Sequence, residues 1–112
     1  MYPSGVVQAA IDAYHAHDLD RCLSFYATDV VVKDRNGNVL MSGGDEVRAR
    51  YAKSMAEHPD LHYGIPNRIS LGAFVVDEES LTGFADARPQ PVRAVLIYRF
   101  EGELIREITI LT

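Results

Sequence analysis

Apolar side chains recur at helical spacing in three stretches of the first half of the chain, at residues 4–16, 19–26 and 45–58. Ser4 and Asp18 precede the first two stretches and are their expected N-caps, because their side-chain oxygens can accept hydrogen bonds from the first turn. Ser42 or Asp45 could cap the third stretch. The pattern therefore predicts three helices, and the last should end before Pro59, which cannot continue it.

After residue 60 the period of the apolar positions changes to two, which predicts strands at residues 61–71, 74–84, 92–100 and 104–111. Short turns at Gly72-Ala73 and Glu101-Gly102 join two of the pairs, so neighbouring strands should run antiparallel. Pro66 cannot donate a hydrogen bond to a neighbouring strand. It therefore indicates a bulge or an edge position in the first of these strands.

A shorter hairpin precedes the third helix. Val30 and Val32 alternate with outward positions up to Asp34, Asn36-Gly37 offers two positions that favour positive φ, and residues 39–41 return. Asp34 lies on the face that the two valines direct to the interior. A carboxylate there is either an acid–base group tuned by an apolar pocket, or a group that caps the turn or pairs with an arginine.

Helices that are segregated from strands along the chain indicate an α+β fold. The chain has 112 residues, of which 47% are hydrophobic, and this is the size and composition of one globular domain over residues 1–112. A curved antiparallel sheet with three helices packed on one face would form a cone. We therefore expect a pocket between the sheet and the helices.

Charge and composition narrow the range of partners. The net charge is -5 and no Lys/Arg-rich run is present, so nucleic acid and acidic membranes are not expected partners. No apolar run approaches the roughly 18 residues of a membrane span, and the N-terminus lacks the features of a signal peptide. The lone Cys22 fits a reducing cytoplasm. The four histidines form no metal-ligand pattern, so neither a metal nor a cofactor is expected.

The strand at residues 92–100 is apolar on both faces. One face carries alternating apolar residues from Val92 to Phe100, and the other carries Val95 and Ile97. An antiparallel strand with one solvated face should instead alternate between apolar and polar residues. We therefore expect the second face to be covered, either by a second copy of the chain in a homodimer or by a terminal strand or loop of the same chain.

Two segments, HDLDRCLSFYATDVVVKD at residues 17–34 and SGGDEVRARY at residues 42–51, precede the meander of strands. In this order they resemble the nuclear transport factor 2-like superfamily, and within it the SnoaL-like branch that includes polyketide cyclases and ketosteroid isomerases. The resemblance covers nearly the whole chain. It implies a cone of curved sheet and three helices with a deep pocket, often as a homodimer. It implies no single activity, because members include isomerases, cyclases, dehydratases, epoxide hydrolases and non-catalytic domains.

The resemblance carries over to individual residues only in part. Asp34 matches the strand position of the general base in ketosteroid isomerases. The helix position of their enolate-binding tyrosine is occupied by Ala10, with Tyr14 one turn later, and the late-strand acid position is occupied by Arg93. SnoaL-type cyclases also use an acidic residue, but it comes from a different strand. Ketosteroid isomerase activity is therefore not expected.

Our first hypothesis is a cofactor-independent isomerase or cyclase that moves a proton on a small apolar carbonyl compound, with Asp34 as the acid–base group and Tyr14 or Tyr51 as a hydrogen-bond donor. The alternatives are a non-catalytic small-molecule binding module and a dimeric interaction domain. Asp77, Glu78 and Glu79 are expected to lie mostly in solvent. The residues expected to line the pocket are Tyr51, Met55, His62, Arg93, Val95 and Ile97.

Overall fold

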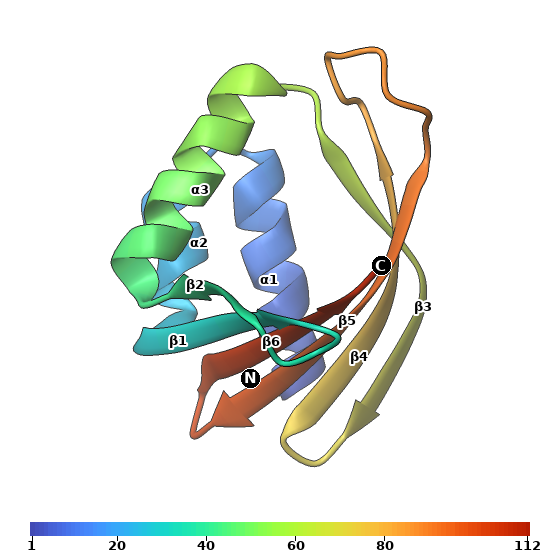
Figure 1. The fold of residues 1–112 in the computed structure, drawn as a ribbon. Helices are drawn as coiled ribbons and strands as arrows, with labels where there is room; N and C mark the ends of the chain where they lie inside the picture. Colours follow the sequence, from blue (N-terminus) through green and yellow to red (C-terminus); the bar gives the residue numbers. More distant parts are fainter.

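The structure, a computed structural model, describes residues 1–112. Its elements are α1 (Pro3–His15), α2 (Leu19–Ser24), β1 (Tyr26–Asp34), β2 (Val39–Ser42), α3 (Gly44–Glu57), β3 (His62–Leu71), β4 (Phe74–Thr82), β5 (Val92–Glu101) and β6 (Leu104–Leu111). All six strands belong to one curved, unclosed sheet, and the three helices lie against one of its faces (Figure 1). The predicted α+β class with helices on one face is confirmed.

The sheet has the order β2-β1-β6-β5-β4-β3. The last four strands form the predicted antiparallel meander, because each pairs with the next in sequence. The early hairpin of β1 and β2 joins the sheet through parallel pairing of β1 with β6. This pairing brings the two halves of the chain together, and it leaves β2 and β3 as the edge strands.

Two of the predicted helix caps are replaced by backbone features. Helix α1 begins at Pro3, one residue before Ser4, because proline lacks an N–H and suits the first helical position. Asp18 caps α2 as predicted, accepting a hydrogen bond from the Arg21 N–H at 3.1 Å. Helix α3 has Gly43 as its N-cap, with φ of 88° and no side-chain cap, so the prediction of a capping Ser42 or Asp45 is wrong.

The first hairpin turn and the bulge in β3 occur at a glycine and a proline, respectively. In the first hairpin only Gly37 has a positive φ, of 82°, so the predicted pair of positive-φ residues at Asn36-Gly37 is wrong for Asn36. The pairing of β3 with β4 shifts register between Gly64 and Asn67, on either side of Pro66. Pro66 therefore occupies both a bulge and an edge strand, the two positions that its sequence context predicted.

The core lies between the helices and the concave face of the sheet. It includes Val7 and Ile11 of α1, Val30 of β1 and Ile105 and Ile108 of β6. Burial of this shared face holds the helices in place, since the apolar area removed from water is the main favourable term. None of the three helices combines the length and the apolar character that crossing a bilayer requires.

No helix covers the convex face of the sheet (Figure 1). Some apolar side chains on this face are exposed. Ile69 and Leu71 of β3 are 66% and 77% exposed. Val95 and Ile97 of β5 lie on this face too, because they alternate with the inward-facing Leu96. The structure thereby corrects the expectation that Val95 and Ile97 line the pocket.

Candidate functional site

Strand β4 places two acidic side chains inside the protein. Val75, Asp77, Glu79 and Leu81 share the inward face, since successive strand residues point to opposite faces. Asp77 is 0% exposed and Glu79 is 2% exposed. The expectation that both lie in solvent is therefore wrong, and only the intervening Glu78 faces outward.

Asp77 is neutralised by an arginine from the neighbouring strand. Arg68 donates two hydrogen bonds to its carboxylate, Nε to Oδ1 at 2.6 Å and Nη2 to Oδ2 at 2.8 Å. Arg68 also donates from Nη1 to Gln8 Oε1 of α1 at 2.9 Å. This bidentate geometry satisfies the buried carboxylate and ties β3, β4 and α1 together. Asp77 thus has a structural role.

Glu79 has no such partner. Its Oε2 atom is buried and receives no hydrogen bond. The pKa of the Glu79 carboxyl is raised to about 8, chiefly by burial and also by the nearby Asp77, with Arg68 acting in the opposite direction. At neutral pH this carboxyl therefore holds its proton most of the time, and it can act as a hydrogen-bond donor.

The strands on either side leave room around Glu79. Ala94 on β5 is directly opposite Glu79 and has a small side chain. On the other side lies the β3 bulge, at residues 65 and 66. Bulges often occur next to functional sites, where they redirect the chain and its side chains. Together the small residue and the bulge make space in front of the carboxyl.

That space is a cavity of about 240 Å³ between the sheet and α3. Ten of its fourteen lining residues are hydrophobic, and the polar ones are Arg50, Ser54, Glu79 and Thr112. Its volume is just below the range of about 300–1,000 Å³ for most ligand pockets, so it would hold a small molecule. A mainly apolar cavity with one buried carboxyl is the arrangement that raises a carboxyl pKa toward neutrality.

A second, smaller cavity of about 30 Å³ lies next to the first, deeper among the helices. All ten of its lining residues are hydrophobic, and five are tyrosines: Tyr14, Tyr26, Tyr51, Tyr63 and Tyr98. Tyr51, Tyr63 and Leu96 line both cavities and so lie between them. The smaller cavity has space for about one water molecule and none for a substrate.

The tyrosine hydroxyls nearest to α3 already have partners. The Tyr14 hydroxyl donates to Ser54 Oγ at 2.7 Å, and the Tyr26 and Tyr51 hydroxyls lie 3.1 Å apart. Burial raises the pKa of Tyr26 and Tyr51 well above the usual value of 10. Tyr14, predicted as a donor to the substrate, therefore faces the small cavity and binds Ser54 instead.

Asp34 lies in the first hairpin turn, outside both cavities. Its Oδ1 accepts hydrogen bonds from the N–H groups of Asn36 at 2.8 Å and Asn38 at 2.9 Å, and its Oδ2 accepts one from Asn38 Nδ2 at 3.0 Å. These bonds lower the pKa of Asp34 below its ordinary value. The geometry thus corrects the acid–base role expected of Asp34 in favour of the alternative, a turn cap.

The other predicted pocket residues are dispersed. Tyr51 lines the 240 Å³ cavity, while Met55 packs against the core as a partly buried side chain. His62 is exposed and stacks on His15, with ring centroids 4.6 Å apart. Arg93 is exposed and pairs with Glu78, the outward-facing residue of β4. The structure therefore corrects the expectation that Met55, His62 and Arg93 line the pocket.

The sequence contained a signal for Glu79. Three consecutive acidic residues suggest a segment that faces solvent. However, Val75, Asp77, Glu79 and Leu81 are spaced by two residues, and the first and last of them are apolar. That spacing assigns Asp77 and Glu79 to the buried face. Arg50 had no comparable signal, because it is an exposed residue of an amphipathic helix.

Comparison with solved structures shows the same fold in many proteins. An uncharacterised cystatin-fold protein from Novosphingobium aromaticivorans has a TM-score of 0.90 and 27% identity, with 100% of this chain and 99% of that chain covered. A proposed polyketide cyclase from Sinorhizobium meliloti has a TM-score of 0.78 and 18% identity, covering 95% of this chain and 93% of the other. A protein of ketosteroid isomerase-like fold from Catenulispora acidiphila, in complex with trimethylamine, has a TM-score of 0.74 and 21% identity, covering 94% and 82%.

The comparison with curated proteins found no match. The family model for the SnoaL-like domain, in contrast, matches residues 7–108. This match includes every strand of the sheet except the last residues of β6, and it includes all the polar residues of the Glu79 cavity except Thr112. The resemblance found in the sequence is thereby confirmed, and the chain belongs to the SnoaL-like domain family.

Proposed function

We propose that this protein binds a small, mainly apolar carbonyl compound in the 240 Å³ cavity and that Glu79 transfers a proton to or from it, as an isomerase or cyclase would. The observation that carries this proposal is the buried Oε2 of Glu79, which has no hydrogen-bond partner within the protein. Leaving a buried polar group unsatisfied costs about 1–3 kcal/mol. A ligand with a hydrogen-bonding group in the cavity would supply the missing partner.

The environment of Glu79 suits proton transfer near neutral pH. A general acid or base works best when its pKa is close to the operating pH. With its pKa of about 8, the Glu79 carboxyl can donate a hydrogen bond to a carbonyl oxygen while protonated, and it can accept a proton from an adjacent carbon once ionised. The apolar walls favour the neutral form and exclude water from the reacting atoms.

One observation favours the alternative of binding without catalysis. The Tyr14 hydroxyl donates its proton to Ser54 Oγ, so Tyr14 is not free to stabilise an enolate oxygen beside Glu79. A binding module would use Glu79 only as a hydrogen-bond donor. The two functions differ in whether a carbon–hydrogen bond of the ligand is broken.

Exchange of hydrogen for deuterium separates these functions. Small ketones such as phenylacetone would be incubated with the protein in deuterated water, and NMR would follow the hydrogens next to the carbonyl. The native protein should accelerate exchange, Glu79→Gln should lose the acceleration, and Glu78→Gln, which changes the outward neighbour, should keep it. Binding without exchange would establish the binding module, and absence of binding would refute both.

We also infer that two copies associate through the convex face of the sheet, where Ile69, Leu71, Val95 and Ile97 lie outside the core. Apolar side chains that remain outside the core on one face of a sheet are typical of a protein–protein interface. A symmetric dimer would cover the face with its own copy. The buried free thiol of Cys22 agrees with a location in the reducing cytoplasm.

A further inference from the structure

Arg50 on α3 lies at the border between two hollows. It lines the Glu79 cavity, and it lines a neighbouring polar hollow of about 420 Å³. Ser54, one turn later on the helix, is the other residue that both share. Arg50 therefore lies where the apolar cavity passes into a polar, solvent-exposed region.

The other cations near Arg50 have acidic partners. On the same helix, Arg48 pairs with Asp20 at 2.7 Å, and Lys53 lies 3.9 Å from Glu57. Arg50 makes no ion pair and no side-chain hydrogen bond with any residue of the chain. Its guanidinium is thus an unneutralised cation at the mouth of the cavity, in a protein whose net charge is -5.

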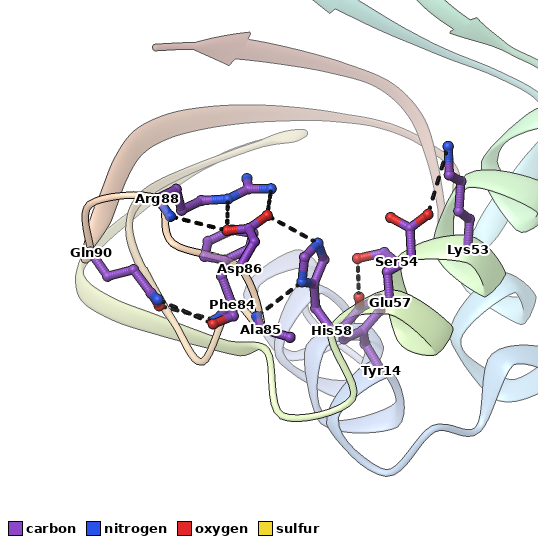
Figure 2. A network of polar contacts seen from close by, with 10 residues as sticks. All are labelled: Tyr14, Lys53, Ser54, Glu57, His58, Phe84, Ala85, Asp86, Arg88 and Gln90. Carbon is purple, nitrogen blue, oxygen red and sulfur yellow. Dashed lines mark hydrogen bonds and ion pairs between the residues drawn. The ribbon is translucent and has the colours of Figure 1, made fainter.

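The far wall of the polar hollow is held in place by its own contacts (Figure 2). The Gln90 side chain accepts from the Phe84 N–H at 3.0 Å and donates to the Phe84 carbonyl at 3.2 Å. His58 Nδ1 accepts from the Ala85 N–H at 3.1 Å. Arg88 belongs to this wall, but its charge is taken up by Asp86 at 2.6 Å. These contacts preorganise the wall. Because Arg88 is paired with Asp86, Arg50 remains the free cation of the hollow.

We propose that the natural ligand of the cavity is a small carboxylic acid, with its apolar body beside Glu79 and its carboxylate bound by Arg50 at the mouth. This inference rests on the proposed function, since it takes Glu79 to contact the same molecule. A guanidinium has the planar fork that binds a carboxylate through two parallel hydrogen bonds. One free cation matches a single negative charge, so a carboxylate fits better than a doubly charged phosphate.

The test compares ligands that differ only in charge. Benzoylpropionate has an aryl body, a ketone and a carboxylate, and its primary amide has the same shape without the charge. Calorimetry at pH 6 would measure both, because at that pH Glu79, with a pKa of about 8, is protonated. The native protein should bind the acid at least about tenfold more tightly than the amide, as one charge-assisted pair provides.

Two variants separate the role of Arg50 from a general effect of charge. Arg50→Gln should abolish the preference for the acid, so that the acid and the amide bind with similar affinity. Arg48→Gln removes the same charge from the same helix but outside both hollows, and it should keep the preference. Equal binding of acid and amide by the native protein would overturn the inference while leaving the proposed function intact. Absence of binding by either would overturn both, and tighter binding of the matching phosphonate would reject the carboxylate.

Discussion

Asp77 and Glu79 are two residues apart on the same face of β4, yet only Asp77 is paired with an arginine. Arg68 holds the Asp77 carboxylate by two hydrogen bonds of 2.6 and 2.8 Å, while Oε2 of Glu79 has no partner. A buried charge is stable only when it is paired, whereas an unpaired carboxyl keeps its proton. The same strand thus presents one ionised structural acid and one neutral acid that faces a cavity.

Replacement of Glu79 by leucine should stabilise the protein. The substitution removes an unsatisfied buried carboxyl and adds an apolar side chain to a mainly apolar cavity, so the free energy of unfolding at pH 7 should increase by about 1–3 kcal/mol. Denaturant titration would measure the change, with Glu78→Leu on the outer face as the matched control. A decrease in stability for Glu79→Leu alone would mean that the carboxyl has a stabilising partner.

The stability of the native protein should fall as the pH rises from about 4.5 to about 8. The pKa of Glu79 is raised to about 8 in the folded state from an ordinary value of 4.5, so in this window the folded state binds the extra proton. The slope attributable to Glu79 should be at most about 1.4 kcal/mol per pH unit. Asp77 and Arg68 are the charged groups that shift the Glu79 pKa, Arg50 lines the same cavity, and the pKa values of the nearby Tyr51, Tyr63 and Tyr98 are raised above 10.

The measurement for this prediction is the difference in unfolding free energy between the native protein and Glu79→Gln at a series of pH values. Taking the difference cancels the contributions of the ionisable groups that both proteins share. The glutamine variant should lose the downward slope. Parallel curves for the two proteins would contradict a raised pKa at this position.

Removal of the negative charge of Asp77 should lower the pKa of Glu79. Asp77 raises that pKa, and in Asp77→Asn the Arg68 guanidinium would act on Glu79 without its own carboxylate partner. Breaking a buried pair should also destabilise the fold by about 3–5 kcal/mol. NMR of the carboxyl carbon of Glu79 would follow its titration in the variant. A pKa that stays unchanged would show that burial alone determines it.

Substitution of Asp34 should affect the hairpin and leave ligand chemistry unchanged. Asp34→Ala removes the acceptor of the Asn36 and Asn38 N–H groups, so the melting temperature should decrease. Deuterium exchange into phenylacetone should proceed at the native rate, because Asp34 lies outside the Glu79 cavity. Loss of exchange in this variant, with the fold retained, would restore Asp34 as the acid–base group.

A charge placed on the convex face should separate the proposed dimer. Ile97→Asp would put a carboxylate in the middle of the apolar face, where a partner copy would have to bury it. Sedimentation should then detect monomers, while Tyr2→Asp, at the exposed residue that precedes α1, should leave the dimer intact. A native protein that sediments as a monomer would refute the dimer itself.

The fold could be predicted from the sequence because its signals are local. The bounds of β6 at Leu104–Leu111 and the bulge around Pro66 follow from periodicity and from the missing proline donor. The helix caps of α1 and α3 were harder, since backbone conformation at Pro3 and Gly43 replaced the expected side-chain caps. Such replacements change the ends of a helix and leave its position in the fold unchanged.

The candidate site was harder to predict because it depends on where a strand stops. Period-two alternation places Asp34 inside, but at the end of β1 its side chain bonds to the backbone of the turn, and such local bonds compete with strand geometry. In β4 the alternation continues through Asp77 to Leu81, so Glu79 remains inside. Which of two acids lacks a partner depends on Arg68, and this is visible only in the structure.

Titration of Glu79 tests the central claim most directly. NMR of its carboxyl carbon, assigned by comparison with Glu79→Gln, would be recorded across the pH range with and without phenylacetone. We predict a pKa near 8 in the free protein and a shift of the carboxyl resonance when the ketone binds. A pKa near the ordinary 4.5, with no response to the ketone, would show that Glu79 is solvated and would contradict its proposed role in the cavity.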